Sequence, residues 1–409
     1  MNVYDELVQR GFVQQVSNES ALRALLEKEK ITCYIGFDPT ATSLHVGNLV
    51  QIMALAHMQR AGHRPIALMG GGTVMIGDPS GRTELRQLLT LEQITANAAK
   101  IREQFSRFIS FENDKALLIN NADWLLKLNY VEFLRDIGRH FSVNRMLATE
   151  AYKTRLETGL TFLEFNYQVL QAYDYLMLHR RYGCVLQMGG NDQWGNILPG
   201  ADLVRKVENK EVFALTTPLL TTASGQKMGK TAAGAVWLSA EKFKPYDFYQ
   251  YWINVDDRDV IKLLRLYTFL SLAEIAKLEK LQGAELRTAK ELLASEVTTL
   301  LHGKEEAEKA KKAAHALFSH EGEGAEIPTM RLNSSRFAQG MKAIDLFHLA
   351  GLSPSKSEAR RLIEGGGAYV NRRRIESIED VITAADFEDD ALLLRAGKKR
   401  YLKVVVEDD

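Results

Sequence analysis

Short apolar runs alternate with longer segments of helical periodicity in the first half of this sequence of 409 residues. The first run, ITCYIGFDP (31–39), alternates between two kinds of residue, as a strand with two different faces does. Similar runs are HRPIALMGGG (63–72), ALLINNADW (116–124) and CVLQMGG (184–190). Strands that alternate with helices form parallel sheets covered by helices on both faces. The sequence therefore predicts a doubly wound, Rossmann-like α/β domain.

The pattern changes further along the chain. Residues 245–320 show only helical periodicity, and SHEGEGAEIPTMRLNSS (319–335) has the composition of a linker. Helical and strand patterns resume after it. The predicted organisation is a Rossmann-like catalytic domain at 1–220, a lysine loop with a helical domain at 221–320, a linker at 321–340, and a small α+β domain at 341–409.

Composition limits the classes of function. The formal net charge is zero, which excludes a globally basic nucleic-acid binder and leaves only local basic patches. The two cysteines, Cys33 and Cys184, stand far apart in apolar runs, which favours buried thiols in a reducing, cytoplasmic setting. We find no signal peptide, no membrane-spanning run and no metal-ligand spacing.

The turn after the first strand carries the first candidate site, within GFDPTATSLHVGNLV (36–50). A helix begins near Leu44, and helix N-termini attract anions. His45 and Asn48 share a face of its first turns, while Gly47 leaves room for a flat ring, so the turn could hold a nucleotide. Taken alone, a histidine at such a place more often serves packing or solvation.

A second loop, TTASGQKMGKT (221–231), which we call the lysine loop, places Lys227 and Lys230 three residues apart beside glycines. Two ammonium groups on such a loop could close over a polyphosphate, although lysines on polar loops are usually only solvated. The two motifs in this order on a doubly wound pattern are much more specific than either one.

Together the motifs resemble the two signatures of class I aminoacyl-tRNA synthetases, and the longer stretches resemble the bacterial tyrosyl members over essentially the whole chain. Those stretches are YIGFDPTATSLHVGN, GGGTVMIGDPSGR, FLRDIGRHFSVNRM, FNYQVLQAYDY, QMGGNDQWGN and KMGKT. The family's first motif usually ends in His where this chain has Asn48, and Gly229 and Thr231 match the tyrosyl form of the second. The resemblance implies L-tyrosine, ATP with Mg²⁺ and tRNA(Tyr) as partners, a homodimer joined through residues 133–146, and no protein metal site.

Tyr167, Gln171 and Asp174 follow helical spacing on one face, which periodicity alone would more often turn to water. By resemblance, Tyr167 and Gln171 contact the amino group of tyrosine, and Asp174 joins Tyr34 at its phenol. The resemblance further assigns Asp78 to the substrate ammonium, Gln193 to the orientation of tyrosine and Asp192 to the ATP ribose.

The implied reaction is attack of the tyrosine carboxylate on the α-phosphorus of ATP, so the nucleophile belongs to the substrate. Catalysis then comes from orientation and from cations near the departing pyrophosphate. The resemblance assigns this catalysis to Thr40, His45, Asn48, Arg82, Arg86, Lys227 and Lys230, and ATP binding to Gly36, Asp38, Thr40, His45, Gly47, Asn48, Asp192 and Lys230.

The tail contains GLSPSKSEARRLIEGGGAYVNRRRI (351–375), which resembles the small RNA-binding domain first known from ribosomal small-subunit protein four. The block is close to neutral, so only a segregated face could contact phosphates, and three adjacent arginines could equally be a solvated turn. The candidate RNA-binding residues are Lys356, Arg360, Arg361, Arg372, Arg373 and Arg374.

Three other functions are compatible with parts of this sequence. A tryptophanyl-tRNA synthetase would share the architecture, but Asp174, Tyr34 and the tail favour tyrosine. An inactive RNA-binding factor derived from a synthetase is suggested only by Asn48. A nicotinamide oxidoreductase would need the G-x-G-x-x-G turn, which the first strand lacks.

Overall fold

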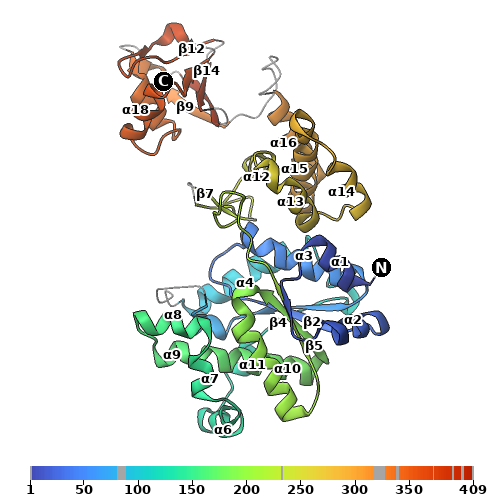
Figure 1. The fold of residues 1–409 in the computed structure, drawn as a ribbon. Coiled ribbons are helices and arrows are strands. Elements are labelled where there is room, and N and C mark those ends of the chain that lie inside the picture. The colour runs from blue at the N-terminus through green and yellow to red at the C-terminus, as the bar shows by residue number, and fades with distance from the viewer. Residues whose placement is uncertain are drawn as a thin grey trace. The chain divides into compact units, whose positions relative to one another are not determined.

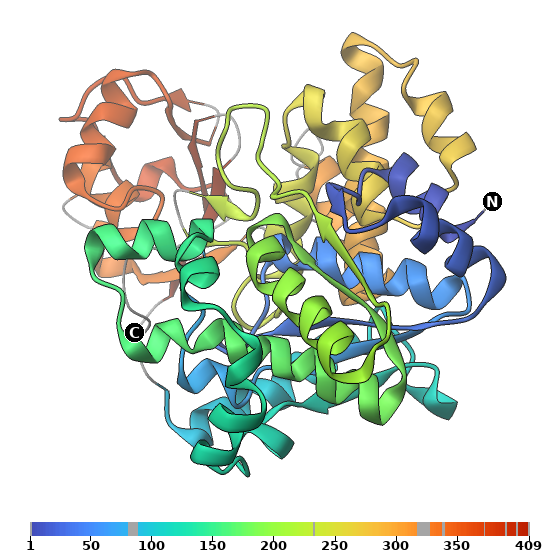
Figure 2. The same ribbon diagram turned by 60° about the horizontal axis from the view of Figure 1, so that its bottom comes forward.

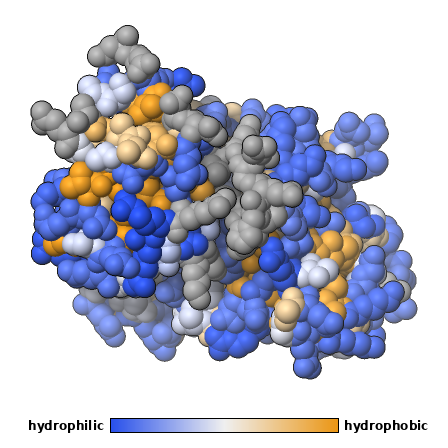
Figure 3. All heavy atoms as spheres, turned by 90° about the horizontal axis from the view of Figure 1, so that it is seen from above, coloured by the Kyte–Doolittle hydropathy of each residue, from blue (hydrophilic) through white to orange (hydrophobic). Residues whose placement is uncertain are grey.

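The computed structural model describes residues 2–80, 89–231, 234–316, 328–337, 340–371, 373–388, 391–397 and 400–407. Contacts group the chain into two compact units, residues 1–311 and residues 312–409. Within the described ranges, no helix combines the length and apolarity needed to cross a membrane. On the side seen in Figure 3, the coloured surface is mostly hydrophilic with separate hydrophobic patches.

The first unit is built on a six-stranded sheet of order β1-β6-β5-β2-β3-β4. All neighbouring strands are parallel except β1 and β6. The winding reverses between β2 and β5, and ligands of such sheets bind beyond the carboxyl ends of the strands at this point. The strands are β1 (Gln15–Val16), β2 (Thr32–Phe37), β3 (Arg64–Met69), β4 (Leu117–Asn120), β5 (Cys184–Gly190) and β6 (Phe213–Thr217).

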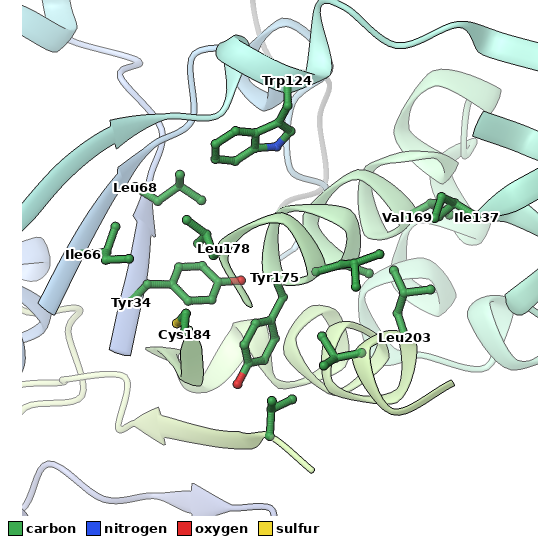
Figure 4. Close-up of a cluster of buried hydrophobic side chains, with 14 of the residues drawn as sticks. Tyr34, Ile66, Leu68, Trp124, Ile137, Val169, Tyr175, Leu178, Cys184 and Leu203 are labelled. Carbon is green, nitrogen blue, oxygen red and sulfur yellow. The ribbon is translucent and has the colours of Figure 1, made fainter. Parts of the chain in front are cut away.

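Helices cover both faces of this sheet, which confirms the predicted doubly wound class. α1 (Val3–Arg10) and α3 (Val46–Arg60) lie on one side, and α10 (Tyr167–Tyr182) and α11 (Trp194–Glu208) lie on the other (Figures 1 and 2). The core beneath α10 gathers Tyr34, Tyr175, Leu178 and Cys184 (Figure 4). Cys33 and Cys184 are free and buried, as expected.

The remaining elements of the first unit extend the sheet domain. α2 (Glu19–Lys28) precedes β2, α4 (Leu91–Phe105) precedes β4, and the short β7 (Lys230–Thr231) and β8 (Gly234–Ala235) pair after β6. Between β4 and α10 run α5 (Ala122–Leu125), α6 (Tyr130–Asp136), α7 (Val143–Leu147), α8 (Glu150–Thr158) and α9 (Phe162–Phe165). The expected helical region contains α12 (Pro245–Ile253), α13 (Val260–Tyr267), α14 (Leu272–Leu278), α15 (Leu286–His302) and α16 (Lys304–Ala316).

The second unit is an open sheet of order β12-β11-β14-β15-β9 with two helices, α17 (Ala343–Leu349) and α18 (Lys356–Glu364). β10 (Met341–Lys342) and β13 (Val381–Ile382) form a separate antiparallel pair. The sheet strands are β9 (Thr329–Asn333), β11 (Ala368–Val370), β12 (Arg373–Arg374), β14 (Ala391–Ala396) and β15 (Arg400–Glu407).

Two features of the fold were not foreseen. The sequence pattern did not predict β1, because it has only two residues, or β6, because its segment does not alternate between polar and apolar residues. Residues 329–333 were expected inside the linker but form β9, which pairs in parallel with β15 from Thr329 to Asn333. Pairing with a strand so distant in sequence overrides the local Gly- and Ser-rich composition. The finer division of the chain at residues 220 and 320 stays a prediction.

Candidate active site

The HVGN motif (45–48) and the KMGKT motif (227–231) meet at the start of α3. The N–H of Val46 donates to the carbonyl of Val236 at 2.9 Å, and His45 forms a β-bridge with Trp237. Gly229 has a φ of +80°, and a Cβ there would lie 2.9 Å from the nitrogen of Gly47. The lysine loop therefore packs directly on the first turn of α3, and only glycine fits the contact.

The first motif makes structural contacts within its own turn. The first N–H of α3 is already used by Val236, so it is not free for an anion. Asn48 Oδ1 accepts from the N–H of His45 at 3.2 Å, as the third residue of a capping box does. A Cβ on Gly47 would lie 2.8 Å from His45 Cε1, so the ring that Gly47 accommodates is His45's own imidazole.

The cationic groups are described only in part. The side chain of Lys227 is exposed, and its backbone bridges to Thr221. Thr40 is exposed as well, in the turn after β2. The side chain of Lys230 and the whole of Arg82 and Arg86 fall outside the described residues.

Asp174 is fixed by two donors that we did not foresee. Its exposed fraction is 2%, Trp124 Nε1 donates to Oδ1 at 2.7 Å, and Asn121 Nδ2 donates to Oδ2 at 2.9 Å. Burial raises the pKa of Asp174 to about 7, although the hydrogen bonds from Asn121 and Trp124 oppose this shift. Both donors follow β4 at the carboxyl edge of the sheet, and this position was the signal that could have identified them.

Asn121 also connects Asp174 to the turn after β2. Its Nδ2 approaches Thr73 Oγ1 at 3.0 Å, and Thr73 donates to Asp38 Oδ1 at 3.3 Å. A Cβ on Gly70 would lie 2.2 Å from Asp38 Oδ1, so the glycine turn after β3 is shaped around that carboxylate. Asp38 and Asp174 thus belong to one hydrogen-bonded chain.

Several buried polar atoms near these hydrogen bonds have no partner in the described part of the protein. They are the hydroxyl of Tyr34 and the amide oxygens of Gln171 and Gln187. Burial, and next the charge of Asp174, raise the pKa of Tyr34 well above its ordinary value. Because buried polar groups are nearly always hydrogen-bonded, these atoms require a polar partner, such as water or a ligand. Tyr167 and Asp174 are buried, so the polar face of α10 does not face water, and Gln187 was missed by sequence reasoning.

A second cluster of polar side chains lies where β5 ends and α11 begins. Gln193 Nε2 donates to Asp78 Oδ2 at 2.7 Å, and Asn196 Nδ2 lies 3.4 Å from Asp78 Oδ1. A Cβ on Gly190 would lie 2.5 Å from Asp192 Oδ1, and the side chain of Asp192 is exposed. Asp78 and Gln193 are therefore brought together as expected, beside Asp192.

Gly36 leaves an opening above the central strand. It is exposed although β2 has neighbours on both sides, and a Cβ placed there would meet no described heavy atom within 4 Å. A flat group could lie over the backbone at this point. Among the described residues, no three His, Cys, Asp or Glu side chains are grouped as a metal site requires.

Some of the candidate RNA-binding residues of the second unit are held in ion pairs within the protein, and others are exposed. Lys356 pairs with Asp345 at 2.7 Å, and Arg373 pairs with Asp386 at 3.0 Å. Arg360 and Arg361 are exposed on α18, and Arg374 is exposed in β12. Arg372 lies outside the described residues.

Comparisons with known proteins agree with this geometry. Residues 26–319 match the family of class I tRNA synthetases (W and Y), and residues 321–404 match the tyrosine--tRNA ligase SYY-like C-terminal domain. The tyrosine--tRNA ligase of Caldanaerobacter subterraneus is 55% identical over 408 residues, covering 100% of both chains. That of Desulfosudis oleivorans is 55% identical and covers 99% of both chains.

Solved structures give the same result. The C-terminally truncated mitochondrial tyrosyl-tRNA synthetase of Aspergillus nidulans matches with a TM-score of 0.70 and 30% identity, over 78% of this chain and 94% of that one. The tryptophanyl-tRNA synthetase of Plasmodium falciparum shares the fold alone, with a TM-score of 0.53 and 13% identity. The chain therefore belongs to the class I tRNA synthetases of the tryptophan and tyrosine family, and within that family to the tyrosine--tRNA ligases.

Proposed function

We propose that this protein activates L-tyrosine with ATP and transfers it to tRNA(Tyr) through the residues assigned below. In the first step the tyrosine carboxylate attacks the α-phosphorus, tyrosyl-adenylate forms and pyrophosphate leaves. In the second step the terminal adenosine hydroxyl of the tRNA takes the tyrosyl group and AMP leaves. The observation that carries the assignment is the buried polar cluster around Asp174, in which the hydroxyl of Tyr34 and the amide oxygen of Gln171 have no partner among the described residues.

The phenol of tyrosine occupies the space between Tyr34 and Asp174. Trp124 and Asn121 each donate to one oxygen of Asp174, so the carboxylate is held with its remaining lone pairs free for the phenolic O–H. The Tyr34 hydroxyl, buried and unpaired in the described structure, supplies the second partner. Phenylalanine would leave the Tyr34 hydroxyl without a partner and would deprive Asp174 of one further hydrogen bond, and a tryptophan ring offers no hydroxyl.

The substrate ammonium lies at the other end of the pocket. Gln171 has a buried oxygen without a partner among the described residues, and Asp78 provides a carboxylate there. Gln193 donates to Asp78 and so keeps that carboxylate in place beside Asp192. Tyr167, which is buried at the start of α10, closes this end.

ATP lies across the switch point of the sheet. The adenosine covers Gly36, its ribose reaches Asp192, and its phosphates face Thr40, His45 and the lysine loop. Lys227 is exposed on that loop, which suits a group that closes only when pyrophosphate is present. Lys230, Arg82 and Arg86 complete the cationic set. Magnesium enters with the nucleotide, bound by its phosphate oxygens.

The active protein is a homodimer. Large apolar side chains are exposed on α6 to α9, including Val131 at 72% and Phe162 at 68%. Exposed apolar clusters of this kind usually mark protein interfaces. The cluster continues through residues 133–146, the segment that sequence resemblance assigned to the dimer contact. We place the enzyme in the cytoplasm, where Cys33 and Cys184 stay reduced.

Charging of a tRNA(Tyr) transcript with labelled tyrosine tests this function. Tyrosine should be esterified to the RNA in the presence of ATP and Mg²⁺, and tryptophan should not. Gln171→Leu should raise the KM for tyrosine without changing the KM for ATP. Charging with tryptophan, or equal effects of this variant on both substrates, would contradict the assignment.

A further inference from the structure

One row of side chains crosses four strands of the second unit. Strand register places Arg374 opposite Tyr369, Tyr369 opposite Arg395, and Arg395 opposite Tyr401. Residues paired across neighbouring strands have their side chains on the same face of the sheet. These four residues, which we call the Arg–Tyr row, therefore alternate arginine and tyrosine across β12, β11, β14 and β15.

The row lies on the face of the sheet away from α17 and α18. Leu392, Leu394 and Val404 are buried in one core with residues of both helices. Side chains alternate between faces along a strand, so Arg395 and Tyr401 point to the opposite side. Arg374 is exposed, and Tyr369, Arg395 and Tyr401 are half-buried.

The row contains a preformed stack. Arg395 Cζ lies 3.6 Å from the centroid of the Tyr369 ring, so the guanidinium covers the ring. Arg395 Nε is buried without a hydrogen-bond partner among the described residues. A planar cation already held on an aromatic ring presents its second face for a further planar group.

The same face carries further positive charge. Lys403 lies two residues after Tyr401 in β15, pairs with Leu393 of β14 and is exposed. Arg331 of β9 lies on this face too, but Glu407 pairs with it. By contrast, Lys356 of α18 is paired with Asp345. The positive charges of the Arg–Tyr row and Lys403 therefore complement a polyanion.

We propose that the Arg–Tyr row binds unpaired bases of the tRNA, with Arg395, supported by Tyr369, and Tyr401 stacking on the bases and Arg374 and Lys403 contacting phosphates. Stacked aromatic and guanidinium groups on a sheet, edged by cations, are suited to unstacked bases of single-stranded RNA. An acidic protein would complement the charges but would leave the planar surfaces unused. The inference rests on the proposed function, because that function supplies the tRNA.

The test measures tRNA charging by the full-length enzyme with Tyr369→Ala/Arg395→Ala. The KM for tRNA should rise about 5- to 150-fold, the range expected for loss of base stacking, while kcat changes little. Tyr369→Phe keeps the ring and should behave as wild type. Arg395→Lys keeps the charge but not the plane and should show most of the loss. Arg336→Gln, an exposed charge change beyond the end of β9, is the control and should leave the KM unchanged.

Two further measurements complete the test. Tyrosine-dependent exchange of pyrophosphate into ATP needs no tRNA, so its absence would refute the proposed function, whereas intact exchange with an unchanged KM for tRNA in a folded variant would refute this inference alone. Such a result would leave the face to a protein partner. Ultraviolet cross-linking of tRNA to the wild-type enzyme should label peptides containing Tyr369 or Tyr401, even if the double variant does not fold. Labels confined to α18 would overturn the proposal.

Discussion

Trp124 Nε1 donates a 2.7 Å hydrogen bond to Oδ1 of Asp174, and the two residues come from different elements, α5 and α10. Asn121 holds the other oxygen. Asp174 is thus oriented by neighbours that themselves need not touch substrate. The position of the Asp174 carboxylate therefore depends on the turn after β4 as much as on α10.

Replacement of this indole should weaken tyrosine binding. Trp124→Phe removes one donor from a buried carboxylate, and an unsatisfied buried group costs about 1–3 kcal/mol. The KM for tyrosine in pyrophosphate exchange should rise about 5- to 150-fold, while the KM for ATP stays constant. A rise in both constants would instead indicate general damage to the domain.

The raised pKa of Asp174 predicts a dependence of tyrosine use on pH. Burial brings this pKa to about 7, and a protonated carboxyl would compete with the hydrogen bonds that its oxygens accept. The kcat/KM for tyrosine should therefore fall as pH decreases below about 7, because this constant reports groups of the free enzyme. The profile is measured by pyrophosphate exchange, and Asp174→Asn should lack this limb.

The same group predicts the sign of a stability effect. The folded-state pKa lies above the ordinary value of 3.8, so the group's stabilising contribution is full below pH 3.8 and is lost as pH rises through about 7. The melting temperature of the wild type relative to Asp174→Asn should therefore decrease between pH 5 and pH 8. No change over that range would mean that the carboxylate is already ionised in the folded protein at pH 5.

The contact between the motifs predicts a difference between two glycines. Gly229 and Gly225 have φ values of +80° and +82°, but a Cβ has close neighbours only at Gly229. Both alanine variants carry backbone strain of about 1–3 kcal/mol, and Gly229→Ala must also push the loop from α3. Its kcat for activation should drop at least tenfold more than that of Gly225→Ala, with little change in the KM for tyrosine. Equal effects would show that the lysines proposed to act in catalysis are positioned independently of this contact.

The exposed apolar cluster predicts an effect on assembly. Val131→Asp/Leu134→Asp would place carboxylates in the proposed interface, where unpaired charges are unfavourable. Sedimentation at micromolar concentration should show a dimer for the wild type and a monomer for this variant. Val8→Asp, at an exposed apolar residue of α1, serves as the control and should remain a dimer. A dimeric interface variant would locate the contact elsewhere.

Sequence patterns identified the parallel strands because buried strands are short, apolar and regularly spaced. They also placed Tyr167, Gln171 and Asp174 on one face of α10, but periodicity favoured exposure, and only tertiary packing decides that this polar face is buried. Trp124, Asn121 and Gln187 were missed because their roles arise from strands and turns that are distant in sequence. The capping function of Asn48 could have been recognised from its position three residues after His45.

The proposed function depends most on selection of tyrosine through its hydroxyl. The most direct measurement compares kcat/KM for tyrosine and phenylalanine in pyrophosphate exchange. Tyrosyl-tRNA synthetases are a standard example of such selection, and the effect is applied to this chain, not discovered in it. Loss of the two hydrogen bonds that the hydroxyl would make with Tyr34 and Asp174, at about 1–3 kcal/mol each, predicts a preference of about 30-fold at least, and up to about 10⁴-fold. A preference below tenfold would show that Tyr34 and Asp174 do not read the hydroxyl.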